Sequence, residues 1–263
     1  MMDRESLSIS TCFDYNIPIE SQIPLIAEAG FTHVSLGSNR SHFDYLSKDA
    51  RQKFTELLNQ YSLNIDTIHG PDADNTSIEE FKGIAEASVE FKAPVVVLHG
   101  SPFGFDKDEL DSRFLELKKL CREIDVISQN TGITFALENV LPGPATELIR
   151  MILLEIDSKY IGFCYDSSHD QIEGPHSFEL LEELKRKLVA VHLSDRVKEF
   201  VDHVIPWEGF IDWDELCRIL KGSNLTFPLL LEVMTTHSAE KDPVKFLTLA
   251  YERGCRLYDK IFM

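Results

Sequence analysis

Acidic and histidine side chains follow short apolar runs at several places along the sequence. His69 and His99 each close a run of hydrophobic residues and are each followed by a glycine. Glu138, Asp166 and Glu232 stand at the ends of three later runs in the same manner. Imidazole and carboxylate groups are typical ligands of divalent metal ions, and carboxylates also transfer protons as general acids and bases. The residue types therefore indicate metal binding and proton-transfer chemistry.

Further histidines accompany these positions. His169 follows Asp166 by three residues, about one helical turn, in the segment Asp-Ser-Ser-His. His192 lies inside another apolar run, and His203 directly follows Asp202 in a long polar segment. A single histidine beside an apolar run is more often a hydrogen-bonded core residue than a ligand. The repetition over consecutive runs favours one shared site over several isolated core residues.

The runs that carry these residues are almost continuously apolar, which is typical of parallel strands covered on both faces. Amphipathic segments with helical periodicity fill the intervals. Gly30 and Gly132 fit helix ends, Pro243 fits a first helical turn, and Thr76 with Glu79 fits a capping box. The expected strands are Leu7–Phe13, Thr32–Gly37, Asn64–His69, Pro94–His99, Ile133–Asn139, Ile161–Asp166, Leu188–Ser194 and Pro228–Val233.

Eight strand–helix units in 263 residues predict a (β/α)₈ TIM barrel, an α/β fold, with residues 1–263 forming a single domain. An open doubly wound sheet is the alternative, but no Gly-x-Gly-x-x-Gly follows the first strand, and we expect no nucleotide cofactor. The carboxyl ends of barrel strands meet at one mouth. Glu138, Asp166 and Glu232 would converge there and repel one another without a cation, so the fold predicts a metal centre.

Composition and charge limit the classes of binding partner that the sequence predicts. The sequence has 26 basic and 44 acidic residues, a formal net charge of −18, which disfavours nucleic acid and anionic membranes. Apolar runs such as Ala93–Leu98 are too short to span a bilayer. The first residues lack the layout of a signal peptide, and the five cysteines form no Cys-x-x-Cys pair. These observations predict a reduced, cytoplasmic protein without membrane contact.

The charges are also unevenly distributed over the predicted barrel. The clearest basic run, Lys185–Lys187, ends a helix and should lie on the face opposite the mouth. The basic residues expected near the mouth are Arg40, Lys107, Arg196 and Lys198. The acidic residues expected there are Asp72, Asp74, Asp106, Asp108, Asp170, Glu173, Glu199, Asp202 and Glu208. This distribution favours a small metal-chelating substrate over DNA, which requires several phosphate contacts from Lys or Arg.

The spacing of Glu138, Asp166, His192 and Glu232 over the last four predicted strands resembles the metal-binding set of the xylose isomerase-like barrel superfamily. The most specific segments are Asp166-Ser-Ser-His169, His192-Leu-Ser-Asp195 and the loop from His203 to Trp213. That superfamily includes sugar isomerases and epimerases, related dehydratases, and DNA-repair enzymes of the endonuclease IV type. Its members are often dimers or tetramers, so the resemblance implies a homo-oligomer.

The resemblance also implies a ligand set. Glu138, Asp166, His192 and Glu232 would hold one divalent ion, with Mn²⁺ or Zn²⁺ favoured over Mg²⁺, Co²⁺ or Fe²⁺, and His169 would contact the substrate. In the endonuclease branch extra histidines hold further zinc ions, and the matching residues here are His69, His99, His169 and His203.

Two departures from the superfamily pattern concern the mouth. Asp202 and His203 are adjacent, where the endonuclease pattern has Asp-x-His. The second strand ends in Leu36-Gly37-Ser38-Asn39, without the acidic residue frequent there in sugar isomerases. The first weakens the case for a third metal position, and the second leaves the substrate contacts open.

The leading hypothesis is a metal-dependent isomerase or epimerase of a sugar or related polyhydroxy carbonyl compound, acting by proton transfer through a metal-stabilised enediolate. Glu232 and Glu138 are the expected base and acid, and His169 would orient a hydroxyl. Phe103 and Trp207 are candidates for the wall of the substrate pocket, since sugar faces pack on aromatic rings. The alternatives are a zinc phosphodiesterase acting on abasic DNA and a barrel that binds metal or sugar without catalysis. The expected substrate contacts are His69, His99, Trp207, Arg196 and Lys198.

Overall fold

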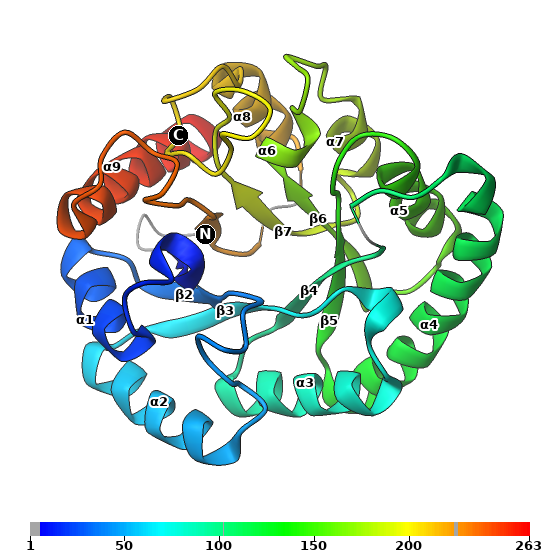
Figure 1. Ribbon diagram of the computed structural model, residues 1–263, viewed down its shortest axis with the longest axis horizontal. Helices are drawn as coiled ribbons and strands as arrows, with labels where there is room; N and C mark the ends of the chain where they lie inside the picture. The colour runs from blue at the N-terminus through cyan, green and yellow to red at the C-terminus, as the bar shows by residue number, and fades with distance from the viewer. Residues whose placement is uncertain (1–5, 102, 224–225) are drawn as a thin grey trace.

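The computed structural model describes residues 6–101, 103–223 and 226–263. Eight parallel strands form a closed barrel in sequence order, in which β1 pairs with both β2 and β8 (Figure 1). This confirms the predicted (β/α)₈ barrel. The strands are β1 (Leu7–Ser10), β2 (His33–Leu36), β3 (Asn64–His69), β4 (Val95–His99), β5 (Thr134–Glu138), β6 (Ile161–Asp166), β7 (Leu188–Leu193) and β8 (Leu229–Leu231).

Helices surround the barrel as an outer ring (Figure 1), and the hydrophobic core fills the layer between them and the strands. Phe81 on α3 packs against Phe135 on β5, with ring centroids 6.1 Å apart. The helices are α1 (Ile19–Ala29), α2 (Lys48–Tyr61), α3 (Ile78–Phe91), α4 (Leu110–Thr131), α5 (Pro144–Glu155), α6 (Ser167–Asp170), α7 (Glu179–Leu184), α8 (Trp213–Lys221) and α9 (Pro243–Phe262).

Local sequence signals account for several helix ends. Gly30 and Gly132 adopt left-handed backbone after α1 and α4, with φ values of 106° and 79°, as the sequence predicts. Pro243 begins α9 as expected. The predicted cap of α3 was wrong by one residue, because Ser77 accepts the capping hydrogen bond from the Glu80 amide. The Thr76 hydroxyl donates instead to a backbone carbonyl.

Small side chains fill the middle of the barrel, and one irregularity places a carboxylate among them. Val34 pairs with Ile65 but Ser35 pairs with Thr67, so Asp66 is an extra residue in β3. Its carboxylate is buried and accepts a hydrogen bond of 2.9 Å from the Ser8 hydroxyl on β1. The apolar neighbours inside the barrel are Val95, Val97, Ala136, Cys164 and Ala190.

β1 and β8 differ most from the predicted strands, each being three residues shorter. β1 ends at Ser10, whose hydroxyl accepts from the Cys12 amide as the chain enters a tight helical turn. β8 ends at Leu231, so Glu232 is the first residue beyond the strand, although its amide still donates to the Leu193 carbonyl. No helix among the described residues is long and apolar enough to cross a membrane.

Candidate metal centre and active site

The carboxylates and imidazoles singled out in the sequence meet at the carboxyl end of the barrel. Glu138 and Asp166 are the last residues of β5 and β6, His192 lies near the end of β7, and Glu232 follows β8. Their ligand atoms all lie within 4.8 Å of one another. The closure of the barrel therefore brings side chains from four strands into one cluster, as the strand-end argument predicts.

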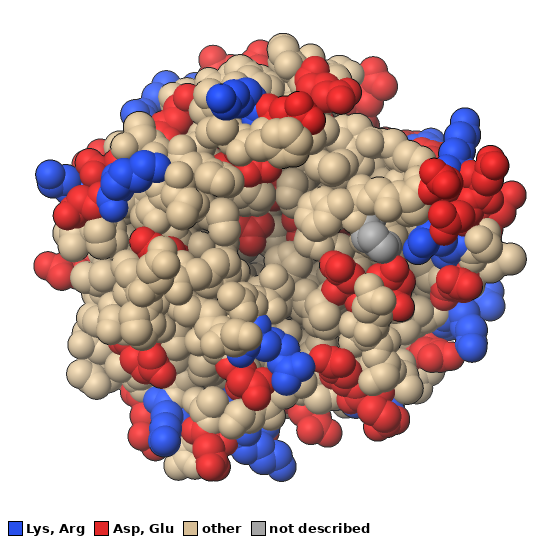
Figure 2. Space-filling view, viewed as in Figure 1, with Lys and Arg blue, Asp and Glu red and all other residues tan. Residues whose placement is uncertain are grey.

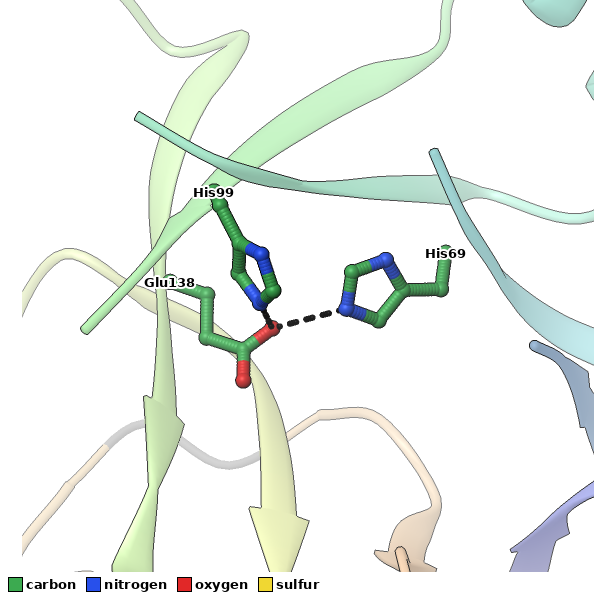
Figure 3. Close-up of side chains that lie close together, drawn as sticks. All are labelled: His69, His99 and Glu138. Atoms are coloured by element: carbon green, nitrogen blue, oxygen red, sulfur yellow. Dashed lines mark ion pairs between the residues drawn. The ribbon is translucent and has the colours of Figure 1, made fainter. Parts of the chain in front are cut away.

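Glu138 lies at the centre of this cluster. Its Oε2 atom is 3.2 Å from His69 Nε2 and 3.7 Å from His99 Nε2, and Figure 3 shows both rings directed at that oxygen. Its Oε1 atom is 3.2 Å from His192 Nδ1 and 3.4 Å from His169 Nδ1. A single buried carboxylate is thus approached by imidazoles from four elements of the fold.

Glu232 occupies the side of the cluster next to β7. Its Oε2 atom is 2.8 Å from His192 Nδ1 and 3.7 Å from His203 Nε2. His203 comes from the loop after β7, where it adopts a φ of 52°, and its Nε2 atom is also 3.8 Å from Asp166 Oδ2. His203 therefore reaches the cluster even though it directly follows Asp202.

The donor set fits a divalent metal ion. Several ligand atoms of the cluster are buried and make no hydrogen bond of good geometry. They are both carboxylate oxygens of Glu138, Oδ2 of Asp166 and both ring nitrogens of His192. Buried polar atoms are normally satisfied, so unsatisfied atoms from three neighbouring strands within one cluster indicate a common partner such as a cation. Mixed imidazole and carboxylate ligands suit Mn²⁺, Zn²⁺ and related ions.

The electrostatics agree with that reading. Burial opposes ionisation, yet His192, His169 and His69 hold the pKa of Glu138 well below its usual range. Glu232 behaves alike, because burial is outweighed by His192 and His203 and its pKa is also lowered well below the usual range. Ionised carboxylates are the form that binds a cation.

Asp166 is held in place by its neighbours. Its Oδ1 atom caps the short helix α6, accepting from the His169 amide at 2.6 Å and the Ser168 hydroxyl at 2.9 Å. The Asn139 side chain exchanges two hydrogen bonds of 2.9 Å with the Asp166 backbone. Oδ1 is therefore used structurally, which leaves Oδ2 directed at the cluster.

A small pocket opens onto this cluster. Its volume is about 230 Å³, and Figure 2 shows the hollow near the centre of the face, with acidic side chains inside it. The pocket is lined by Cys12, Tyr15, Ser38, His69, His99, Phe103, Glu138, His169, His203, Glu232 and Met234. Its floor is thus the predicted site, and its wall comes from the loops after the strands.

A sequence model of the family described as "Xylose isomerase-like TIM barrel" matches residues 23–249. The chain belongs to this family. The resemblance drawn from the motifs of the last four strands is therefore confirmed.

Solved structures share the complete fold of this xylose isomerase-like barrel. The IolI protein with a bound zinc atom superposes with a TM-score of 0.79 at 18% identity, over 97% of this chain and 99% of that chain. A D-tagatose 3-epimerase-like protein superposes with a TM-score of 0.75 at 22% identity, over 97% and 99%. The protein y4fM of Sinorhizobium fredii is 23% identical over 255 residues, covering 83% of this chain and 82% of its own.

Three predicted substrate contacts lie elsewhere in this xylose isomerase-like barrel. The Arg196 side chain is 1% exposed, and its guanidinium donates to the Ser168 carbonyl and pairs with Asp202 at 3.0 Å. Trp207 does not line the pocket, because its ring lies 5.6 Å from Trp213 and 4.0 Å beneath the Arg256 guanidinium of α9. Lys198 is exposed on the loop after β7 and is likewise absent from the pocket wall.

Four wall residues escaped sequence reasoning: Cys12, Tyr15, Ser38 and Met234. Ser38 and Met234 directly follow the predicted second and eighth strands, so the strand-end test that found the histidines also covers them. That test looked for titratable groups and passed over hydroxyl and thioether side chains. Phe103 does border the site, with its ring centroid 5.1 Å from that of His99.

The loop that carries His203 is anchored by Asp195. Its carboxylate accepts four hydrogen bonds, at 2.8 to 3.1 Å, from the amides of Arg196, Trp207 and Ile211 and from the Trp213 indole. Gly209 packs so closely that an added Cβ would lie 2.1 Å from the Arg196 carbonyl oxygen. Asp195, part of the His192-Leu-Ser-Asp195 motif, thus fixes the loop that presents His203.

Proposed function

We propose that this protein is a divalent-metal-dependent isomerase or epimerase of a sugar or related polyhydroxy carbonyl compound. One observation carries the proposal: Glu138 and Glu232 both approach His192 Nδ1, at 3.2 and 2.8 Å, while both also line the pocket. A site with two positioned carboxylates beside a metal-ligand cluster suits proton removal and return at carbon. The named activity of the epimerase-like structural neighbour points the same way.

The chain's own residues account for binding and proton transfer. When bound, the ion supplies a Lewis acid that polarises a carbonyl and stabilises the negative charge that develops beside it. Glu232 has the more accessible carboxylate, with 9% of its side chain exposed against none for Glu138. We assign Glu232 as the base that removes the proton next to the carbonyl. Glu138, which the free site keeps ionised, would first take up a proton and then return it to carbon from its own side of the substrate, while Glu232 releases the proton it removed to solvent.

The histidines would divide the remaining tasks. His169 lines the pocket, and its Nδ1 atom is 3.1 Å from the Asn139 carbonyl, so its ring is oriented with the other edge free for a substrate hydroxyl. His192 is fully buried and does not line the pocket, which suits a ligand without a substrate contact. His69 and His99 would contact substrate oxygens near Glu138.

Isotope exchange tests the proposal directly. Protein loaded with Mn²⁺ or Zn²⁺ should incorporate solvent deuterium next to the carbonyl of at least one ketose, followed by NMR. Glu232→Gln should abolish the exchange while the fold and the bound ion remain. Glu199→Gln, an exposed carboxylate on the same face of the barrel, is the matched control and should retain full exchange. Undiminished exchange in Glu232→Gln would refute its role as base.

A second candidate is cleavage of abasic DNA at a multinuclear zinc site. It is favoured by two further potential ligand groups, His69 with His99 and Glu138, and Asp166 with His169 and His203. The acidic mouth disfavours it, because DNA binding requires phosphate contacts from cationic side chains. Nicking of abasic-site DNA by the zinc-loaded protein would establish this activity. A barrel that binds ligand without turnover would fail both assays while still binding the ion.

We also propose Mn²⁺ or Zn²⁺ as the resident ion and a dimer or tetramer as the assembly. The zinc atom named for the IolI neighbour supports the ion assignment. Metal analysis of the purified protein should find at least one divalent ion per chain, and light scattering should give the assembly. Protein that neither contains nor takes up such an ion would end both enzyme hypotheses.

A further inference from the structure

The wall of the pocket contains hydroxyl, aromatic and thioether groups outside its metal-ligand floor. Tyr15 and Ser38 stand together, since the Tyr15 hydroxyl interacts with the Ser38 side chain and the Asn39 backbone. Phe103 and Met234 supply apolar surface. Pockets for drug-sized ligands measure roughly 300–1,000 Å³, so a volume of about 230 Å³ suits one monosaccharide rather than a longer chain.

Cationic side chains are missing from this wall. The described residues include every Lys and Arg except Arg4, and none of those described lines the pocket. Figure 2 agrees, because the hollow shows acidic side chains and its basic neighbours lie out on the surrounding surface.

The two arginines that the sequence places near the mouth, Arg40 and Arg196, already form ion pairs within the protein. Arg196 is buried against Asp202 and the Ser168 carbonyl. Arg40 pairs with Asp44 and Glu80, each at 3.0 Å. Neither guanidinium is available to an anionic group of a substrate unless it gives up these contacts.

Two carboxylates beside the pocket pair with histidines of its lining. Asp72 is bonded to His99 Nδ1 at 3.0 Å, and Asp202 lies 3.3 Å from His203 Nδ1. A phosphate or carboxylate on a substrate would enter this pocket without a lysine or arginine partner and close to acidic groups. Desolvating an unpaired anion in such a place is strongly unfavourable.

We infer that the substrate is an uncharged, monosaccharide-sized polyhydroxy carbonyl compound that carries neither phosphate nor carboxylate. This inference rests on the proposed function. The reactive end of the substrate lies over Glu138 and Glu232, and its far hydroxyl groups meet Tyr15 and Ser38. Its C–H surface packs on Phe103 and Met234.

Paired substrates test the inference. The metal-loaded protein is given ketohexoses as free sugars and as their 1- and 6-phosphate esters, and deuterium exchange is followed by NMR. We expect kcat/KM for the best free sugar to exceed that of its esters by about 100-fold or more. Equal or faster exchange of an ester overturns the inference and leaves the proposed function standing. Exchange in no member of either series overturns the proposed function, and the inference with it.

Charge placed in the pocket wall gives a second readout that does not need turnover. Ser38→Lys adds a cation at an exposed wall position, and Ser41→Lys adds the same charge nearby outside the pocket. By calorimetry, a ketohexose 6-phosphate should bind Ser38→Lys at least about tenfold more tightly than wild type, whereas Ser41→Lys should match wild type. Tight binding of the ester to wild type, unchanged by Ser38→Lys, would overturn the inference.

Discussion

Two buried carboxylates inside the same barrel have pKa values that are shifted in opposite directions. Glu138, at the mouth, is approached by four imidazoles, and its pKa lies well below the usual range despite complete burial. Asp66, in the middle of the barrel, has the Ser8 hydroxyl as its side-chain partner, and burial raises its pKa from 3.8 to about 7. Burial is common to both, so the partners decide the charge.

The comparison separates function from packing. At the mouth, imidazoles keep the Glu138 carboxylate ionised, and a cation can bind beside them or take their place. Several buried polar atoms there have no hydrogen-bond partner. The middle of the barrel tolerates a carboxylate by favouring its protonated form. A buried acid is therefore informative about function only together with the groups that face it.

The largest effect is expected at the mouth. Glu138→Gln removes the charge that the imidazoles converge on, so divalent-ion affinity should fall by more than the roughly 10–100-fold caused by losing an outer partner of a ligand. Isothermal titration with Mn²⁺ and Zn²⁺ measures this, with Glu199→Gln as control. Unchanged affinity would remove Glu138 from the ligand set.

Asp66→Asn should increase the free energy of unfolding, whereas Glu138→Gln is expected to weaken ion binding. Between pH 3.8 and about 7 the folded protein holds a proton on Asp66 that the unfolded chain releases, so this group lowers stability as pH rises. Asparagine keeps an acceptor for Ser8 without the charge. The variant should gain up to about 4 kcal/mol at pH 8 and less than half of that at pH 5. Urea unfolding at both pH values measures the difference, and an equal gain at both would contradict the raised pKa.

Asp195→Asn tests a third buried carboxylate, one whose oxygens are fully engaged by donors. The amide nitrogen cannot accept from Trp207 and Trp213, so we expect a loss of about 3 kcal/mol and faster hydrogen exchange over residues 195–213. Trp213→Phe removes one donor and should cost about half as much. If exchange in the loop stays as slow as in wild type, Asp195 does not anchor it.

The smallest effect is expected for Ser8→Ala. The variant loses a hydrogen bond to an ionised acceptor at pH 8, which should cost about 1.5 kcal/mol, and less at pH 5 where Asp66 is protonated. In the Asp66→Asn background the same change should cost about 1 kcal/mol or less at either pH. A cost independent of pH in both backgrounds would show that Ser8 acts through packing.

Most of the fold could be predicted, because hydrophobic periodicity and chain length together leave few architectures. The ligand cluster could be predicted for a related reason: Glu138 and Asp166 end their strands, and closing a barrel necessarily brings strand ends together. Neither inference needed a side-chain contact. The predicted roles of the individual residues remain proposals.

Side-chain direction in the loops was beyond the sequence. Trp207 was expected at the substrate because sugar faces pack on aromatic rings, and Arg196 because its guanidinium could meet a phosphate or carboxylate. The Asp195 hydrogen bonds instead turn that loop so that Trp207 packs against α9 and Arg196 is buried. The register shift at Asp66 was also missed. The sequence shows a charged residue inside the strand Asn64–His69, but the shift depends on how this strand pairs with β2.

The loop after β7 also indicates where this barrel tolerates redesign. Its base is rigid, because Asp195 holds four donors and Gly209 leaves no space for a side chain. Its tip is different, since Val197 and Phe200 are 46% and 80% exposed. Insertions are best accepted at exposed loop tips. A foreign lid segment could therefore be grafted between residues 197 and 200 while His203 keeps its place.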